Sequence, residues 1–277
     1  MAEGRGWKQV RAGVLLAVVA VLAAACTTTT TTSGSNLATT KAGKKTAAEQ
    51  RQEAVANYVQ VGLGYIGQRN RDQARLNLLR ALEIDSRSPA AHNGMALLYQ
   101  LERDPAHAEE HFRSALRHDP DFTQARNNYG VFLASEERYE EALAAFEIAS
   151  RDTSYSLRPQ VFSSLGMVAN RLGRTEEARA AWERAIALDP TLANPYLELA
   201  EFHFNRGDYP LAKRYLNAHG SVARPSARSL WLEVRVEDAF GNANGVASKG
   251  LALRNLFPYA AETVEYQEWS RNRGDAR

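Results

Sequence analysis

The stretch SLGMVANRLGRTEEARAAWERAIALDP, residues 164–190, decides how this chain folds. Its first half carries Gly166 among apolar residues, and its second half places Trp182 between Ala178 and Ala185. The two alanines are seven residues apart, so they lie on one face of a helix. Small residues on neighbouring helices let the two axes approach closely, and a large side chain fills the space beside them. The stretch therefore predicts two packed helices joined by a short turn.

The same pattern recurs along the chain with a period of 34 residues, lengthened once to 36. In each unit a pair of alanines encloses a large apolar residue. The enclosing pairs and enclosed residues are Ala74 and Ala81 with Leu78, Ala108 and Ala115 with Phe112, Ala142 and Ala149 with Phe146, and Ala178 and Ala185 with Trp182. A helix–turn–helix unit of 34 residues with this spacing is the tetratricopeptide repeat pattern.

One such unit cannot bury its apolar face alone, so neighbouring units must stack. We therefore predict an all-α protein, a right-handed superhelical solenoid of about six tetratricopeptide repeats. The sixth repeat is degenerate, because Gly250 stands where the large apolar residue should be, as in an atypical terminal repeat. The predicted domain spans residues 51–270 and is followed by a tail, residues 271–277. Its repeats lie near 55–88, 89–122, 123–156, 159–192, 193–226 and 227–260.

The N-terminal segment is typical of an exported protein. Arg5, Lys8 and Arg11 precede fourteen uncharged residues, 12–25, a run too short to span a bilayer. The segment 1–25 is predicted to be a lipoprotein signal peptide. The chain's single cysteine, Cys26, follows it, and a lone cysteine cannot form an internal disulfide.

The sequence LAAAC around Cys26 resembles the lipobox of bacterial lipoproteins. This resemblance implies cleavage before Cys26 and lipidation of Cys26, and several acyl chains make a lasting anchor. The alternative is a stray thiol in a discarded or frayed segment. Residue 27 is Thr rather than Asp, which by the same resemblance implies the periplasmic face of the outer membrane. Residues 26–50 are Thr-rich and low in complexity, so they are predicted to form a lipidated flexible tether.

The segment from His107 to His111, HAEEH, matches the H-x-x-E-H pattern of inverted zinc proteases. The equivalent positions of other repeats hold mixed, mostly polar residues, so we predict a solvated outer stripe rather than a metal site. The other histidines are scattered along the chain, and neither a nucleophile–histidine set nor a phosphate-binding loop is found. We therefore predict no catalytic residues, no metal, no cofactor and no small-molecule substrate. The remaining histidines are His92, His118, His203 and His219.

The charge balance also restricts the partners. The chain has 34 Lys and Arg and 32 Asp and Glu, and removal of residues 1–25 leaves equal numbers of each. A neutral chain does not favour nucleic-acid binding, which needs a basic surface.

A stacked solenoid forms a concave groove lined by the first helix of each repeat, and positions 2, 5, 9 and 12 of the repeat are expected to face it. Such a groove suits an amphipathic helix or an extended peptide. The alternative is that Val59, Leu63 and Ile66 are capped by the segment before residue 55 or packed in the core. The candidate partner-binding residues are Val59, Leu63, Ile66, Asn93, Leu97, Asn127, Val131, Met167 and Asn170.

The segment 122–174, with its NNYG sequence, resembles the type IV pilus biogenesis and stability lipoproteins, the pilotins of the PilF/PilW family. The segments ARSLWLEVRV at 227–236 and LFPYAAETVEYQEW at 256–269 add to the resemblance. It implies structural roles for residues of the NNYG segment and of the longer link between repeats three and four. These family-like residues are Asn128, Tyr129, Gly130, Asp152, Tyr155 and Arg158.

The resemblance further implies a non-catalytic pilotin. Such a protein binds the subunit of the type IV pilus secretin and promotes its localisation to the outer membrane and its multimerisation. The alternative is an outer-membrane repeat lipoprotein that acts as an adaptor for peptidoglycan hydrolases or synthases, since a fold alone does not fix a function.

The lipid anchor can be tested by the substitution Cys26→Ser. We expect the variant to leave the outer-membrane fraction and to keep its melting transition, because Cys26 lies outside the predicted repeats. Membrane fractionation and thermal unfolding measure the two effects. A variant that remains in the outer-membrane fraction would contradict the lipidation of Cys26.

Overall fold

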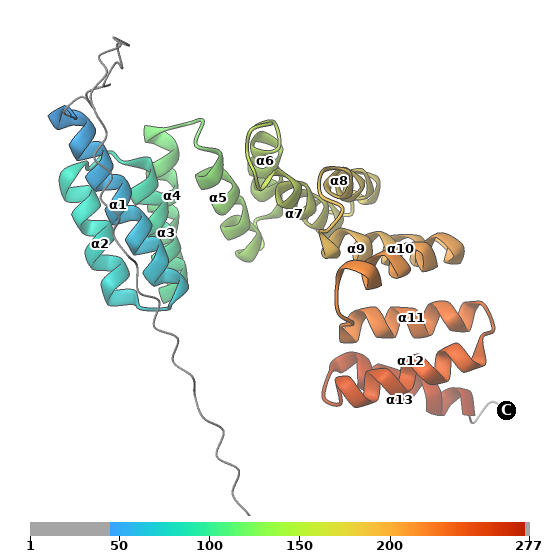
Figure 1. The fold of residues 1–277 in the computed structure, drawn as a ribbon. Helices are drawn as coiled ribbons and strands as arrows, with labels where there is room; N and C mark the ends of the chain where they lie inside the picture. The colour runs from blue at the N-terminus through green and yellow to red at the C-terminus, as the bar shows by residue number, and fades with distance from the viewer. Residues whose placement is uncertain (1–44, 275–277) are drawn as a thin grey trace, which may run out of the picture. The chain divides into compact units, whose positions relative to one another are not determined.

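The fold is given by a computed structural model that describes residues 45–274 (Figure 1). The signal peptide 1–25, Cys26 and most of the predicted tether lie outside these residues. The described residues form helices joined by turns and short links and contain no strand, which confirms the all-α prediction. No helix of residues 45–274 combines the length and the hydropathy needed to cross a membrane. The helices are α1 Ala47–Gly67, α2 Arg71–Ile84, α3 Pro89–Glu102, α4 Pro105–His118, α5 Thr123–Ser135, α6 Tyr139–Ala149, α7 Arg158–Arg171, α8 Thr175–Leu188, α9 Ala193–Asn205, α10 Tyr209–Val222, α11 Ala227–Ala239, α12 Ala243–Leu256 and α13 Ala261–Gly274.

The first twelve helices form six antiparallel hairpins, in which an odd-numbered helix A packs on the following even-numbered helix B. Each hairpin also packs on the next one, so the repeats stack in chain order (Figure 1). One hydrophobic cluster runs without interruption from repeat 2 into repeat 5, from Ala96 to Leu199. This continuity confirms the prediction that a single repeat does not form a core of its own.

The closest contact inside a hairpin joins a small residue of helix A to a large residue of helix B. A Cβ atom on Gly166 would lie 2.5 Å from Cδ1 of Trp182, and one on Gly130 would lie 2.8 Å from Cε1 of Phe146. Real side chains do not approach this closely, so only glycine permits the observed separation of these helices. Trp182 and Phe146 are almost fully buried and are among the largest side chains of the core.

The turn between helices A and B has a constant shape. One residue of the turn has a φ angle between 58° and 78° in all six hairpins. Glycine takes this left-handed conformation in the last three turns, as at Gly173, and it does so without steric cost. The first three turns place Arg69, Arg103 and Glu137 there, where a side chain costs about 1–2 kcal/mol.

The N-terminal boundary of the domain differs from the prediction. α1 begins at Ala47, inside the segment 26–50 assigned to the tether and before the predicted domain start at residue 51. The cause is a capping box: Oγ1 of Thr46 accepts a hydrogen bond from N of Glu49 at 3.2 Å, and the Glu49 carboxylate accepts one from N of Thr46 at 2.7 Å. This reciprocal pair satisfies backbone donors at the start of a helix.

The C-terminal end carries a helix that the repeat pattern did not predict. α13 packs on α11 and α12 and runs to Gly274, into the predicted tail 271–277. Its Tyr266 covers Gly250, where a Cβ atom would lie 2.8 Å from Cε2 of the tyrosine ring. Nε1 of Trp231 donates a hydrogen bond to Oε2 of Glu265 at 2.8 Å and fixes α13 further. The large side chain that helix B of repeat 6 lacks is therefore supplied by the capping helix.

The close contact in repeat 4 predicts the effect of Gly166→Ala. The added methyl group must displace the rigid, buried Trp182, so we expect a loss of about 1–3 kcal/mol in the free energy of unfolding. The matched control is Gly64→Ala in α1, where a Cβ atom would have nothing within 4 Å; it should gain about 0.5–1 kcal/mol. Urea unfolding followed by circular dichroism measures both.

The same Gly166→Ala substitution in a Trp182→Phe variant makes this test specific. Repeat 2 pairs Ala96 with the smaller Phe112 at the equivalent positions, so Trp182→Phe should relieve part of the loss caused by Gly166→Ala. Equal stability changes for the Gly64 and Gly166 variants would contradict the proposed contact.

Candidate partner-binding surface

The exposed residues of the odd-numbered helices form the candidate site. α1 packs directly on α3, α3 on α5, and α5 on α7. We define the A-helix face as the residues at repeat positions 2, 9 and 12 of these four helices, together with the half-buried Asn127 and Ser163 at position 5 of α5 and α7. Its largest exposed apolar side chains are Val131 and Met167, which are 48% and 47% exposed. Both occupy position 9, as do the half-buried Leu63 and Leu97.

Three half-buried residues of the face also pack against the core. Leu63 packs at the edge of the cluster formed by the first hairpin and the start of α3, and Ile66 packs at the edge of a second cluster there. Leu97 packs against the long cluster of repeats 2 to 5. Asn127 is half-buried, and Asn170 is exposed. These five residues, with Val131 and Met167, stay candidates for contact with a partner.

Two predicted groove residues are buried, and the prediction that they line the groove is wrong. Val59 is 6% exposed and packs with Ala81 and Ala91, and Asn93 is 1% exposed. Oδ1 of Asn93 accepts a hydrogen bond from Nδ2 of Asn128 at 3.1 Å. Both residues occupy position 5, which faces the next A helix rather than solvent. Packing between repeats therefore uses this position in α1 and α3.

The NNYG segment joins repeat 3 to repeat 2. Asn128 makes the bond to Asn93 just described, and Oη of Tyr129 donates a hydrogen bond to Oε1 of Glu109 at 2.9 Å. The same Glu109 carboxylate lies 2.7 Å from Nη1 of Arg138. Gly130 forms the close contact inside its own hairpin. The three family-like residues of this segment thus lie in packing contacts.

Hydrogen bonds of side chains stabilise the link between repeats 3 and 4. Oδ1 of Asp152 accepts a hydrogen bond from N of Ser154 at 2.9 Å, and its Oδ2 accepts one from Oγ1 of Thr123 at 2.6 Å. The hydrogen bond from the Ser154 hydroxyl, followed by these two bonds, lowers the pKa of Asp152. Nε of Arg158 donates to the carbonyl of Ser150 at 2.7 Å, and Tyr155 packs on the long core cluster. The longer link is an ordered connection.

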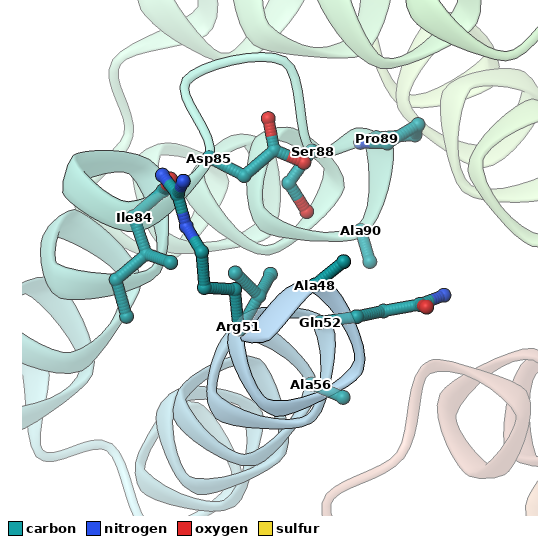
Figure 2. A pocket seen from close by; sticks show the side chains of 10 residues that line it. Ala48, Arg51, Gln52, Ala56, Ile84, Asp85, Ser88, Pro89 and Ala90 are labelled. Atoms are coloured by element: carbon teal, nitrogen blue, oxygen red, sulfur yellow. The ribbon is translucent and has the colours of Figure 1, made fainter. Parts of the chain in front are cut away.

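A pocket of about 630 Å³ lies between α1 and the turn that leads from α2 into α3 (Figure 2). Nη2 of Arg51 reaches across it from α1 and donates a hydrogen bond to the carbonyl of Ile84 at 3.1 Å. Ser88 lines the opposite wall, where its Oγ caps α3 by accepting from N of Ala91 at 3.3 Å. The pocket is lined largely by small and apolar residues at the end of the stack nearest the N-terminus.

The histidines of repeat 2 lie together, although their spacing in the sequence did not predict a cluster. Nδ1 of His92 lies 3.0 Å from Nδ1 of His111, and Nε2 of His92 lies 3.1 Å from the carbonyl of Ser86. Neutral His92 must donate from Nε2 to this carbonyl, so its Nδ1 accepts from Nδ1 of His111. His111 is half-buried, and the prediction that it lies in a solvated outer stripe is wrong. Its ring lies beneath Tyr99, with 5.4 Å between ring centroids.

The exposed His107 is paired with Asp104, with 2.6 Å between Nδ1 and Oδ2. Among residues 45–274, no group of three or more His, Cys, Asp or Glu side chains is arranged to hold a metal ion. The sequence did contain a signal for the His92–His111 pair. Both residues belong to repeat 2, at positions 4 and 23, and these positions lie on the two helices of a single hairpin.

Comparisons with known proteins agree with this architecture. Residues 95–156 match a family model described as tetratricopeptide repeat, and residues 168–207 match one described as TPR repeat. The type IV pilus assembly protein PilF of Pseudomonas aeruginosa is 36% identical over 217 residues, which cover 78% of this chain and 86% of that protein. The chain belongs to the PilF family.

Solved structures of the family share the fold. A Pseudomonas aeruginosa PilF structure has a TM-score of 0.75 and 36% identity, covering 79% of this chain and 99% of that one. The structure of PilW, described as a widely conserved type IV pilus biogenesis factor, has a TM-score of 0.69 and 27% identity and covers 77% and 98%. The protein is thus an all-α tetratricopeptide-repeat protein of type IV pilus biogenesis, as the sequence predicted.

The histidines predict a loss of stability in mild acid. Burial lowers the pKa of His92, His111, His203 and His219 in the folded chain. The unfolded chain, with histidine pKa values near 6.5, therefore binds protons first as the pH falls, and the free energy of unfolding decreases from about pH 7 to about pH 5. Urea unfolding across this range measures the decrease.

The substitution His92→Asn removes one of these groups and should make the decrease smaller. An unchanged slope in this variant, or a stability that rises as the pH falls from 7 to 5, would contradict the burial of neutral histidines.

Proposed function

We propose that the protein is a pilotin, anchored by lipid at Cys26 to the periplasmic face of the outer membrane. In this proposal it binds the subunit of the type IV pilus secretin and promotes its localisation to the outer membrane and its multimerisation. The observation that carries the proposal is the 36% identity with a type IV pilus assembly protein over most of both chains. The lipobox-like sequence at Cys26 and the non-catalytic character of a repeat scaffold support it.

The A-helix face is the proposed binding surface for the secretin subunit. Val131 and Met167 are exposed apolar side chains on successive A helices, and such residues gain free energy when a partner covers them. The exposed Asn170 and the half-buried Leu97 and Asn127 flank them. Contact with a partner at this face leaves the core contacts of the repeats unchanged.

With the proposed lipid anchor, a moderate affinity for the secretin subunit would be sufficient to promote its assembly. Residues 27–46 separate Cys26 from the first helix, so the repeat domain would stay within a short distance of the membrane. A bound secretin subunit would then be held in the same small volume as other bound subunits, and tethering of this kind gives effective concentrations of about millimolar. Assembly of the multimer is favoured by this local concentration and requires no catalysis.

The test replaces exposed apolar residues of the face by charges. In a strain that lacks the protein, we expect the wild-type copy to restore secretin multimers in the outer membrane and Val131→Glu with Met167→Glu to fail. A carboxylate buried against an apolar partner weakens binding by about tenfold or more. The matched control is Ile148→Glu on α6, whose side chain is 44% exposed on a helix B.

Gel electrophoresis of outer-membrane fractions measures the multimers, and thermal unfolding checks that all variants fold. Normal multimers in the strain without the protein would overturn the proposed function and would favour the role as an adaptor for cell-wall enzymes. Restoration by the double variant would overturn the proposed surface.

A further inference from the structure

Repeat 2 holds four of the six histidines of the chain, and two of them join its helices. The four are His92 on α3 and His107, His111 and His118 on α4. Nδ1 of His92 lies 3.0 Å from Nδ1 of His111, and both side chains are half-buried. Neither residue belongs to the A-helix face, so the proposed binding of the secretin gives this pair no role.

The distance between the two nitrogens matches that of two ligands on one metal ion. Imidazole nitrogens bind divalent transition metals at about 2.0–2.1 Å. With 3.0 Å between the Nδ1 atoms, an ion at that distance from both would have an N–metal–N angle of roughly 95°. Angles near a right angle are typical of the square-planar coordination that Cu²⁺ and Ni²⁺ adopt with nitrogen and oxygen ligands.

The hydrogen bond of His92 on its other nitrogen also suits a metal ligand. Nε2 of His92 donates to the carbonyl of Ser86, in the turn between α2 and α3, at 3.1 Å. Histidines that bind metals commonly donate their second N–H to a carbonyl, which fixes the tautomer and the ring orientation. An ion would replace the proton between the two Nδ1 atoms. His111 would then carry that proton on Nε2, so neither ring would change its charge.

Neighbouring rings hold the pair in place. Tyr99 stacks on His111 with 5.4 Å between ring centroids, and His118 stacks on His92 with 5.6 Å. Burial lowers the pKa of His92 and His111. Both rings are therefore neutral near pH 7, as ligands of a metal ion must be.

Charged groups of both signs surround the pair. The carboxylates of Asp85 and Glu110 favour a positive charge on its rings, and the guanidinium groups of Arg75 and Arg117 oppose it. Arg75 is itself ion-paired with Glu102. Because these effects oppose one another, repulsion does not prevent a cation from binding at the pair.

We propose that Nδ1 of His92 and Nδ1 of His111 chelate one divalent transition-metal ion, with Cu²⁺ preferred over Ni²⁺ and Zn²⁺. Nitrogen ligands in general bind Cu²⁺ most tightly among these ions. No third His, Cys, Asp or Glu side chain among residues 45–274 completes the site, so water fills the other positions and the ion can exchange. The ion would link α3 to α4, and it would stabilise repeat 2 because only the folded chain brings the two ligands together.

The proposed site differs from the HAEEH motif, although His111 belongs to both. The motif would pair His111 with His107 on the same helix. His107 is exposed, and its Nδ1 lies 2.6 Å from Oδ2 of Asp104. The proposed ligand His92 lies instead on the other helix of the hairpin, so variants can separate the two sites.

The experiment titrates Cu²⁺, Ni²⁺ and Zn²⁺ into the full-length protein in detergent, without a histidine tag and after treatment with a chelator. We expect calorimetry to show one Cu²⁺ ion per chain with a dissociation constant below about 100 µM. At ten times that constant the melting temperature should rise by roughly 3–6 °C. Electron paramagnetic resonance of the Cu²⁺ form should show two coordinated imidazole nitrogens.

Histidine variants supply the matched comparison. His92→Asn and His111→Asn each remove one ligand and should weaken Cu²⁺ binding by about tenfold or more. His107→Asn and His118→Asn should leave the affinity within about threefold of the wild-type value. Thermal unfolding without metal checks that each variant folds, and the resonance spectrum of the wild-type protein decides the ligands if one of them does not.

Three results would overturn the inference. They are a dissociation constant for Cu²⁺ above about 100 µM, a spectrum without two imidazole nitrogens, and a Cu²⁺ affinity that His92→Asn leaves unchanged. Loss of binding in His107→Asn with retention in His92→Asn would place the ion at the HAEEH motif instead. Each of these results leaves the proposed function intact, because secretin multimers are measured separately.

Discussion

The close contact between a small residue of helix A and a large residue of helix B determines the architecture of the described repeats. Gly166 against Trp182 and Gly130 against Phe146 set the separation of the helices in their hairpins. Once this separation is fixed, the remaining apolar surface of each hairpin can be covered only by the next repeat. The stack, the continuous core and the alignment of the A helices all follow from this contact.

The same contact decides which residues are free for function. Packing within the hairpin occupies the glycine position, and packing on the next A helix occupies position 5 of α1 and α3, as the burial of Val59 and Asn93 shows. Positions 2, 9 and 12 remain available for contact with a partner. In repeats 1 to 4 they carry apolar and amide side chains such as Val131 and Gln124, and in repeats 5 and 6 they carry ion-paired groups such as Arg228.

The sequence predicted the repeating features of the fold, because small and large residues at this fixed spacing specify a packed helical hairpin. It therefore indicated the helices, the hairpins and the atypical sixth repeat. It did not predict that α13 covers Gly250 with Tyr266, because no periodic signal connects them. The His92–His111 pair was missed for a related reason: a contact between side chains on two helices depends on their rotation, which spacing along one helix does not specify. The start of α1 was misplaced because the capping box at Thr46 lies in a stretch of polar composition.

The proposed function requires the A-helix face to contact the pilus secretin in the cell. The most direct measurement places a photo-crosslinking residue at position 131 or 167, and at position 148 as the comparison, and identifies the crosslinked protein after irradiation of living cells. We expect crosslinks to the secretin subunit from positions 131 and 167 and none from position 148. Crosslinks to the secretin from position 148 alone, or to a different protein from positions 131 and 167, would contradict it.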